Sequence, residues 1–189
     1  MIGCNNASAT ISETADCIPQ DSVVIKEQNA CFLLISKQDM TISVVDFKSN
    51  KLQSFPIACG RNYGNKRKVG DMKTPEGVYK VQMIQNASKW THDFKDGKGE
   101  IKGAYGSHFI RLATPPHTGI GIHGTHDDSS IGTRATEGCI RLHNTDLVQL
   151  VKYVYINMPV IITGSDKDLD ADCKIIMQSK QKQQANGSK

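Results

Sequence analysis

Long hydrophobic runs and a strong charge bias are both absent from this sequence of 189 residues. No stretch approaches eighteen consecutive apolar residues, so we predict no membrane-spanning helix. The formal net charge is only +4, and aromatic residues make up 6% of the chain. The densest basic run, Lys66-Arg67-Lys68, has none of the interleaved aromatic residues that favour binding to single-stranded nucleic acid. We therefore expect a solvated turn at this run and no nucleic-acid partner.

The start of the sequence also lacks a charged segment followed by an apolar one, which is the pattern of a secretory signal. Met1-Ile2-Gly3-Cys4 instead resembles the end of a bacterial lipoprotein processing site. On this interpretation Cys4 carries a lipid anchor, and the polar residues Asn5–Ala15 form the flexible tether behind it. The alternative is that the sequence begins at an arbitrary point and that Cys4 is unmodified.

The length supports one compact core with polar segments at its ends. We predict a flexible tether over residues 1–20, one domain over residues 21–165 and a polar tail over residues 166–189. The composition of the tail shifts to Asp, Lys, Gln and Ser, so a frayed end is expected. A short amphipathic helix over Asp172–Gln181 is the alternative.

Short runs rich in β-branched residues alternate with polar turns, which predicts strands joined as hairpins. The predicted strands are Val23–Lys26, Cys31–Ile35, Thr41–Asp46, Leu52–Ala58, Val78–Met83, His108–Ala113, Ile120–His123 and Pro159–Thr163. A helix is predicted from about Thr145 to Ile156, because an apolar stripe recurs at helical spacing after the N-cap candidate Asn144. Mostly antiparallel strands with one packed α-helix indicate a mainly β, β-sandwich-like domain.

Residues 122–146 contain the most informative motif. A loop rich in Asp, Ser, Thr and Gly separates His123 from Cys139, so the two residues suit neighbouring strands joined by an exposed connection. A cysteine thiol has a pKa of about 8.5 and becomes a strong nucleophile when an imidazole takes its proton. We predict that Cys139 is a nucleophile and His123 its general base. The alternatives are a buried structural thiol and a packed histidine at a strand end.

This motif closely resembles the signature of L,D-transpeptidase (YkuD-type) catalytic domains. The resemblance is carried by Ile122-His123-Gly124-Thr125 and by Gly138-Cys139-Ile140-Arg141-Leu142. The block Gly70–Tyr79 is similar to the Thr-Pro-x-Gly element of the same family. Together with the strand-like segments between them, these matches extend over roughly residues 22 to 164. They imply the β-sandwich-like fold of that family.

The resemblance implies a cysteine acyltransferase that forms L,D-type cross-links between peptidoglycan stem peptides through a thioester on Cys139. It implies no cofactor and no metal, acylation by carbapenems, and export to the cell envelope or periplasm with any signal already removed. If water is the acceptor, the same machinery is an L,D-carboxypeptidase or endopeptidase. A third hypothesis is an inactive module that binds the cell wall.

Several neighbours of the motif are candidate supporting residues. The family resemblance implies that the carbonyl of Gly124 orients the imidazole, and a glycine there also permits an unusual backbone angle. Gly138 leaves room for a substrate carbonyl, and the amides of residues 137–139 are candidate donors to an oxyanion. Arg141 shares a strand face with Cys139, so it is expected to bind a substrate carboxylate or to hold the loops of the site. Tyr105 is expected to line the substrate groove.

Position 137 departs from the family pattern, because Glu137 stands where the family usually has histidine before Gly-Cys. A carboxylate that points inward would raise the pKa of Cys139. We expect Glu137 instead to point outward or to pair with Arg134 or Arg141. The acceptor preference and the pH optimum are the properties that this change puts in question.

The remaining candidates carry simpler expectations. Cys31 and Cys59 lie beside apolar residues and are predicted to be buried as small hydrophobic side chains. Cys17 and Cys173 lie in polar flanks, and the sequence does not decide whether they pair. Trp90 and Phe94 are candidates for a lid over the cleft. His126, three residues after His123, is a weak alternative metal ligand.

Overall fold

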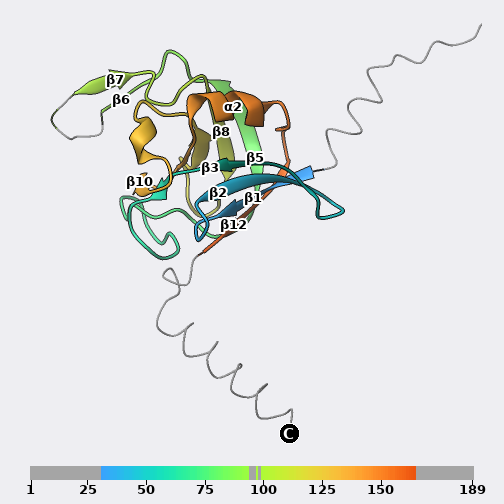
Figure 1. Cartoon of the computed structure of the whole chain (residues 1–189). Coiled ribbons are helices and arrows are strands. Elements are labelled where there is room, and N and C mark those ends of the chain that lie inside the picture. Colours follow the sequence, from blue (N-terminus) through green and yellow to red (C-terminus); the bar gives the residue numbers. More distant parts are fainter. Residues whose placement is uncertain (1–30, 94–96, 98, 165–189) are drawn as a thin grey trace, which may run out of the picture.

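The computed structural model describes residues 31–93, 97 and 99–164. One sheet of eight strands forms the body of the domain, in the order β11-β9-β8-β5-β12-β1-β2-β3, and two small sheets pair β10 with β4 and β6 with β7 (Figure 1). The elements are β1 Cys31–Ser36, β2 Thr41–Asp46, β3 Lys51–Pro56, β4 Cys59–Gly60, β5 Gly77–Asn86, β6 Thr91–Asp93, β7 Glu100–Lys102, β8 His108–Ala113, β9 Gly121–His123, the 3-10 helix η1 Asp128–Ser130, β10 Arg134–Thr136, β11 Ile140–Arg141, α2 Asn144–Val151 and β12 Pro159–Thr163.

Antiparallel pairs dominate the large sheet, as the hairpin pattern predicts. β1, β2 and β3 form a meander, and β12, β5, β8 and β9 continue the sheet in antiparallel pairs. Two contacts in the large sheet are parallel, between β1 and β12 and between β9 and β11. The mainly β fold with one packed α-helix is therefore confirmed in the part of the chain that the structure describes.

The core lies between the sheet and α2, which packs over the sheet in Figure 1. Strand alternation explains the pattern, since Cys31, Leu33 and Ile35 of β1 are buried while the residues between them are partly exposed. From α2, Leu147 and Leu150 are fully buried against this core. Burial of these apolar side chains is the main driving force that holds the strands of the site in place.

Three of the strand predictions hold at both ends. β2, β8 and β12 agree with their predicted bounds to the residue. The strand predicted over Leu52–Ala58 instead ends at Pro56, and a separate β4 follows it. The strand predicted over Val23–Lys26, together with Cys4, Cys17, Phe94, Cys173 and the predicted tether and tail, lies outside the described residues.

The predicted start of the helix agrees with the observed one to within one residue, but the predicted N-cap and the predicted C-terminal end are wrong. α2 runs from Asn144 to Val151, and its N-cap is His143, which makes no side-chain capping bond. Asn144 is the first helical residue, and its side chain bonds the backbone of Thr125 instead. The helix found among these residues is too short to cross a membrane.

Candidate active site

A cleft of about 370 Å³ opens beside Cys139, where loops meet the ends of β9 and β11. Its walls come from five parts of the chain, namely the loop before β5, strand β6, the loop between β7 and β8, the loop before β9 and the segment around the predicted nucleophile. The lining residues are Lys66, Val69, Gly70, Met72, His92, Tyr105, Thr118, Gly119, Ile120, Glu137 and Cys139. Two of the residues predicted from the sequence motif, Glu137 and Cys139, therefore share a cleft with the predicted Tyr105.

The Cys139 thiol lies at the wall of this cleft, half-buried, and donates to the carbonyl oxygen of Gly119 over 3.4 Å. Burial raises the pKa of this thiol above its ordinary value, and the charge of Glu137 adds to the rise. A backbone N–H of Gly121 and the positive charges of Arg141 and Lys66 act in the opposite direction. Burial is the largest of these influences, so the resting group is a protonated thiol near neutral pH.

The imidazole of His123 is buried, with 3% of the residue exposed. Its Nδ1 lies 2.7 Å from the carbonyl oxygen of Gly124, which only accepts hydrogen bonds, so Nδ1 carries the proton and Nε2 is the free base. The ring stacks on Phe109 at 5.7 Å and meets the edge of Tyr105 at 4.8 Å between centroids. Burial lowers the pKa of His123 to about 3, so the imidazole is neutral across the physiological range.

His123 is the last residue of β9, and Cys139 lies in the bend immediately before β11, the strand that pairs with β9 in parallel. Arg141 of β11 pairs with His123 of β9, and Cys139 precedes Arg141 by two residues. The backbone N–H of Gly121 in β9 reaches the Cys139 sulfur, and the His123 ring contacts Tyr105, which lines the same cleft as Cys139, so the thiol and the imidazole lie on the same side of the cleft wall. The sulfur's hydrogen bond within the described chain goes to Gly119 and not to His123, so the thiol must leave that carbonyl before the imidazole can take its proton.

Arg141 lies beneath the loop that joins β9 to β11. Only 5% of the residue is exposed, and its Nη1 donates to Ser130 Oγ over 3.0 Å. It is not among the residues that line the cleft. This placement suits the expected role of holding the loops, whereas the expected binding of a substrate carboxylate has no access. Its charge still favours the Cys139 thiolate.

Gly124 is explained by crowding, and it does not use the unusual backbone angle that a glycine permits. The φ angle of Gly124 is not in the left-handed region. A Cβ at this position would lie 2.1 Å from Asn144 Oδ1 and 3.2 Å from the carbonyl oxygen of Tyr105. Asn144 fills that space because its side chain accepts from Thr125 N and donates to Thr125 O, at 3.0 and 2.9 Å. This clamp fixes the chain just after His123.

Gly138 does need a special backbone angle. Its φ is +136°, and a Cβ there would lie 2.7 Å from the carbonyl oxygen of Lys73. Its N–H donates to Thr136 Oγ1 over 3.1 Å, while its carbonyl accepts from Thr74 Oγ1 over 2.9 Å. The amide of Gly138 is therefore engaged, and the expected oxyanion donors within residues 137–139 reduce to the amides of Glu137 and Cys139.

Thr74 is a supporting residue that sequence reasoning did not single out. It belongs to the Gly70–Tyr79 block, and its hydroxyl bridges two backbones by accepting from Gly60 N and donating to Gly138 O. The residue is fully buried. The Thr-Pro pair in that block could have drawn attention to Thr74. Its hydrogen-bond partner Gly138 is distant in the sequence and is identified only by the fold.

Tyr105, His92 and Glu137 form a polar chain along one wall of the cleft. The Tyr105 hydroxyl and His92 Nδ1 are hydrogen-bonded at 2.9 Å, and His92 Nε2 lies 3.8 Å from Glu137 Oε2. The basic side chain nearest to Glu137 is thus His92, and not Arg134 or Arg141, the two partners expected from the sequence. His92 lies on β6, and nothing in its sequence neighbourhood connected it with the motif.

Two other expectations change at the cleft edges. Lys66 is not a solvated residue of a turn, because it is 8% exposed and its Nζ lies 2.8 Å from Asp71 Oδ1. Its neighbours Arg67 and Lys68 are exposed, as expected. Trp90, a candidate for a lid, packs against the rings of Tyr105 and Phe109 and does not line the cleft. From the hairpin β6–β7, the residue that lines the cleft is His92.

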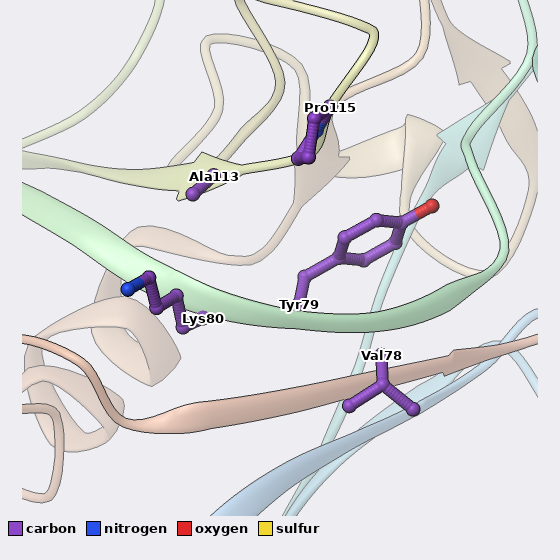
Figure 2. Close-up of a pocket in the computed structure, with 5 residues that line it drawn as sticks. All are labelled: Val78, Tyr79, Lys80, Ala113 and Pro115. Carbon is purple, nitrogen blue, oxygen red and sulfur yellow. The ribbon is translucent and has the colours of Figure 1, made fainter.

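Two further hollows lie along the sheet and hold none of the predicted catalytic residues. A groove of about 600 Å³ runs past Pro115 and Pro116 and shares Thr118 and Gly119 with the cleft beside Cys139. Another hollow of about 400 Å³ lies where Tyr79 and Lys80 of β5 approach Ala113 and Pro115 (Figure 2). The described residues contain no cluster of three or more His, Cys, Asp or Glu side chains suited to a metal, and His126 is exposed in a loop.

The protonation states predict how Cys139 responds to pH. Alkylation of Cys139 by iodoacetamide, followed by peptide mapping, should keep accelerating above about pH 8.5, because the pKa of the buried thiol is raised. No step is expected near pH 6.5, since the pKa of His123 is about 3 and the ring stays neutral there. A rate that levels off below pH 7 would instead reveal a thiolate–imidazolium pair and contradict this assignment.

Comparison with known proteins supplies the family. Residues 32–162 match the family model of the L,D-transpeptidase catalytic domain, YkuD. The Bacillus subtilis protein named "Putative L,D-transpeptidase YqjB" is 25% identical over 142 residues, which span 74% of this chain and 74% of that protein.

Solved structures share the fold at low sequence identity. The helical cell shape determining protein Pgp2 from Campylobacter jejuni superposes with a TM-score of 0.55 at 24% identity, over 77% of this chain and 51% of that one. L,D-transpeptidase 3 from Mycobacterium tuberculosis, in complex with a faropenem-derived adduct, gives a TM-score of 0.53 at 18% identity, over 71% and 60%. This chain therefore matches only about half to three fifths of each of these two solved chains.

Proposed function

Because this chain belongs to the YkuD family of L,D-transpeptidase catalytic domains, we propose that it cross-links peptidoglycan stem peptides through a thioester on Cys139. The observation that carries the proposal is the placement of the motif. Cys139 opens into a cleft, and His123, at the end of the strand that pairs with β11, contacts the cleft residue Tyr105 and keeps Nε2 as its free base. This arrangement suits a thiol nucleophile with an imidazole base.

Acylation begins with the thiol and the imidazole both uncharged. The carbonyl carbon between an L-centre and a D-residue of the donor stem enters the cleft, and the sulfur leaves Gly119 O to attack it. His123 Nε2 takes the thiol proton as the C–S bond forms, and the amides of Glu137 and Cys139 are placed to donate to the oxyanion. The same proton then passes to the departing amine of the terminal D-residue, and the C–N bond breaks.

In deacylation, the proton moves in the opposite direction, from the acceptor amine to the sulfur. The amine of a neighbouring stem attacks the thioester carbon, a new C–N bond forms and the C–S bond breaks. His123 returns a proton from the amine to the sulfur and restores the thiol. Arg141 supports both half-reactions from below, because its charge stabilises negative charge on sulfur and its bond to Ser130 holds the loop.

Product analysis tests the reaction and separates it from hydrolysis. When the protein is incubated with muropeptides that contain tetrapeptide stems, mass spectrometry should detect cross-linked dimers and released D-amino acid. Acetylation of the acceptor amines is the matched control, and it should abolish the dimers. Trimmed monomers without dimers would overturn the transpeptidase assignment in favour of an L,D-carboxypeptidase or endopeptidase. The absence of any product would favour an inactive wall-binding module.

A cell-wall substrate also places the protein in the envelope or periplasm, which we propose as its location. The names of family relatives refer to transpeptidation and to cell shape, which supports that placement. A lipid on Cys4 remains part of this proposal, and mass spectrometry of the native full-length protein tests it. An unmodified Cys4 would remove the anchor and leave the catalytic proposal unchanged.

A further inference from the structure

We infer that Glu137 recruits the cationic amine of the acceptor stem to the acyl-enzyme and thereby favours cross-linking over hydrolysis. The inference rests on the proposed acyltransfer reaction, and it assigns a substrate to the position where this chain departs from the family motif. Glu137 lies two residues before Cys139, and its side chain lines the same cleft.

The charges in the cleft leave Glu137 available to a ligand. Among the described residues that line the cleft, Glu137 is the carboxylate, and Lys66 and His92 are the basic side chains. Lys66 is already matched by Asp71 at 2.8 Å and is nearly buried. His92 Nε2 stands 3.8 Å from Glu137 Oε2, which is longer than a hydrogen bond. Half of the Glu137 side chain is exposed, so its oxygens can accept from a bound ammonium group.

The chemistry of the two half-reactions explains why a carboxylate is tolerated beside the nucleophile. Its negative charge opposes formation of the Cys139 thiolate, which is a cost in the first step. In the acyl-enzyme the sulfur is part of an uncharged thioester, so this repulsion is gone. The attraction between Glu137 and a cation remains, and it acts only in the second step.

An amine acceptor is the natural ligand for such a group. A primary amine has a pKa of about 10 and enters as an ammonium ion near neutral pH, whereas water carries no charge. A carboxylate therefore concentrates amines next to the thioester and leaves water unaffected. The ammonium loses two protons on the way to the amide. One passes through His123 to the sulfur of Cys139, and the other leaves to solvent.

The variant Glu137→Gln tests the inference with a stem tetrapeptide as donor and a stem tripeptide with a free side-chain amine as acceptor. The KM for the acceptor should rise about tenfold, the size expected for one partly exposed charge-assisted hydrogen bond. At low acceptor concentration the ratio of dimer to trimmed monomer should fall by the same factor, while the rate of donor acylation is not reduced. Glu100→Gln is the matched control, because Glu100 is an exposed carboxylate of β7 outside the cleft lining, and it should change neither quantity.

A second variant separates the contribution of His92. His92→Asn removes the imidazole that lies 3.8 Å from Glu137 Oε2 and leaves the carboxylate in place, so the dimer-to-monomer ratio should not fall. An equal loss of cross-linking in this variant would move the role to His92 and overturn the inference. It is also overturned if Glu137→Gln keeps the wild-type ratio, or if the variant slows acylation and both products alike. If the wild-type protein gives no product at all, the proposed function has failed independently of Glu137.

Discussion

Incubation of the wild-type protein with a carbapenem should add the mass of one intact drug molecule, and the variant Cys139→Ala should gain none. The thiolate opens the β-lactam ring by forming a C–S bond and breaking the ring C–N bond, and the thiol proton ends on the ring nitrogen. No atoms leave, so the full drug mass is retained. Intact-protein mass spectrometry measures this directly, and peptide mapping assigns the adduct to Cys139.

The variant His123→Gln should slow the same reaction without abolishing it. Glutamine offers no basic nitrogen, so acylation should slow by about 10²- to 10⁴-fold, the range for loss of a general base. The adduct should still form on long incubation, because the nucleophile is intact. A wild-type rate in this variant would separate the imidazole from the sulfur chemistry. An adduct that persists in Cys139→Ala would place the nucleophile elsewhere.

The positions of the cysteines in the fold make this experiment specific. Cys31 and Cys59 are buried, at 4% and 0% exposure, as their apolar neighbours predict. Cys139 is the cysteine that reaches the cleft among the residues the structure describes. Modification of Cys139 at a lower drug concentration than the other cysteines is therefore the expected pattern.

The sequence predicts the placement of Cys139 and His123 better than it predicts what surrounds them. Both residues belong to one short, distinctive motif, and the structure puts His123 at the end of β9 and Cys139 just before its partner strand β11. His92 comes from a strand of three residues, which is too short to show a period. Its link to Glu137 through the cleft is a tertiary contact that local patterns do not encode.

Polar side chains that bond to backbone groups were the main source of error around α2. Asparagine is a residue type that N-caps favour, and nothing in the sequence argues against that assignment for Asn144. In the fold its amide finds two backbone partners at Thr125, and those bonds replace a cap. The same clamp explains why Gly124 has no room for a Cβ. The local sequence pattern therefore assigns Asn144 to a helix cap, whereas a tertiary contact with Thr125 decides its role.

A buried lysine links the wall of the cleft to the sheet. Lys37 follows β1 and has 1% of its surface exposed. Its Nζ donates to Gly64 O at 3.2 Å, to Thr74 O at 3.4 Å and to Glu76 Oε1 at 2.6 Å. These acceptors belong to the segment that carries Lys66 and the rest of that cleft wall, and they include the residue whose hydroxyl holds Gly138.

Replacement of this lysine should therefore cost more stability than any exposed substitution. Lys37→Met keeps much of the apolar stem but leaves the Gly64 and Thr74 carbonyls and the Glu76 carboxylate without their donor. Because Glu76 is 22% exposed, its charge is partly screened, and we expect the free energy of unfolding to fall by about 3 kcal/mol. Denaturant titration measures the change. Lys51→Met on the exposed edge strand β3 is the control and should shift it by less than about 0.5 kcal/mol. If Lys37→Met were neutral, desolvation of the lysine would already cancel its bonds, and the cleft wall would depend on packing instead.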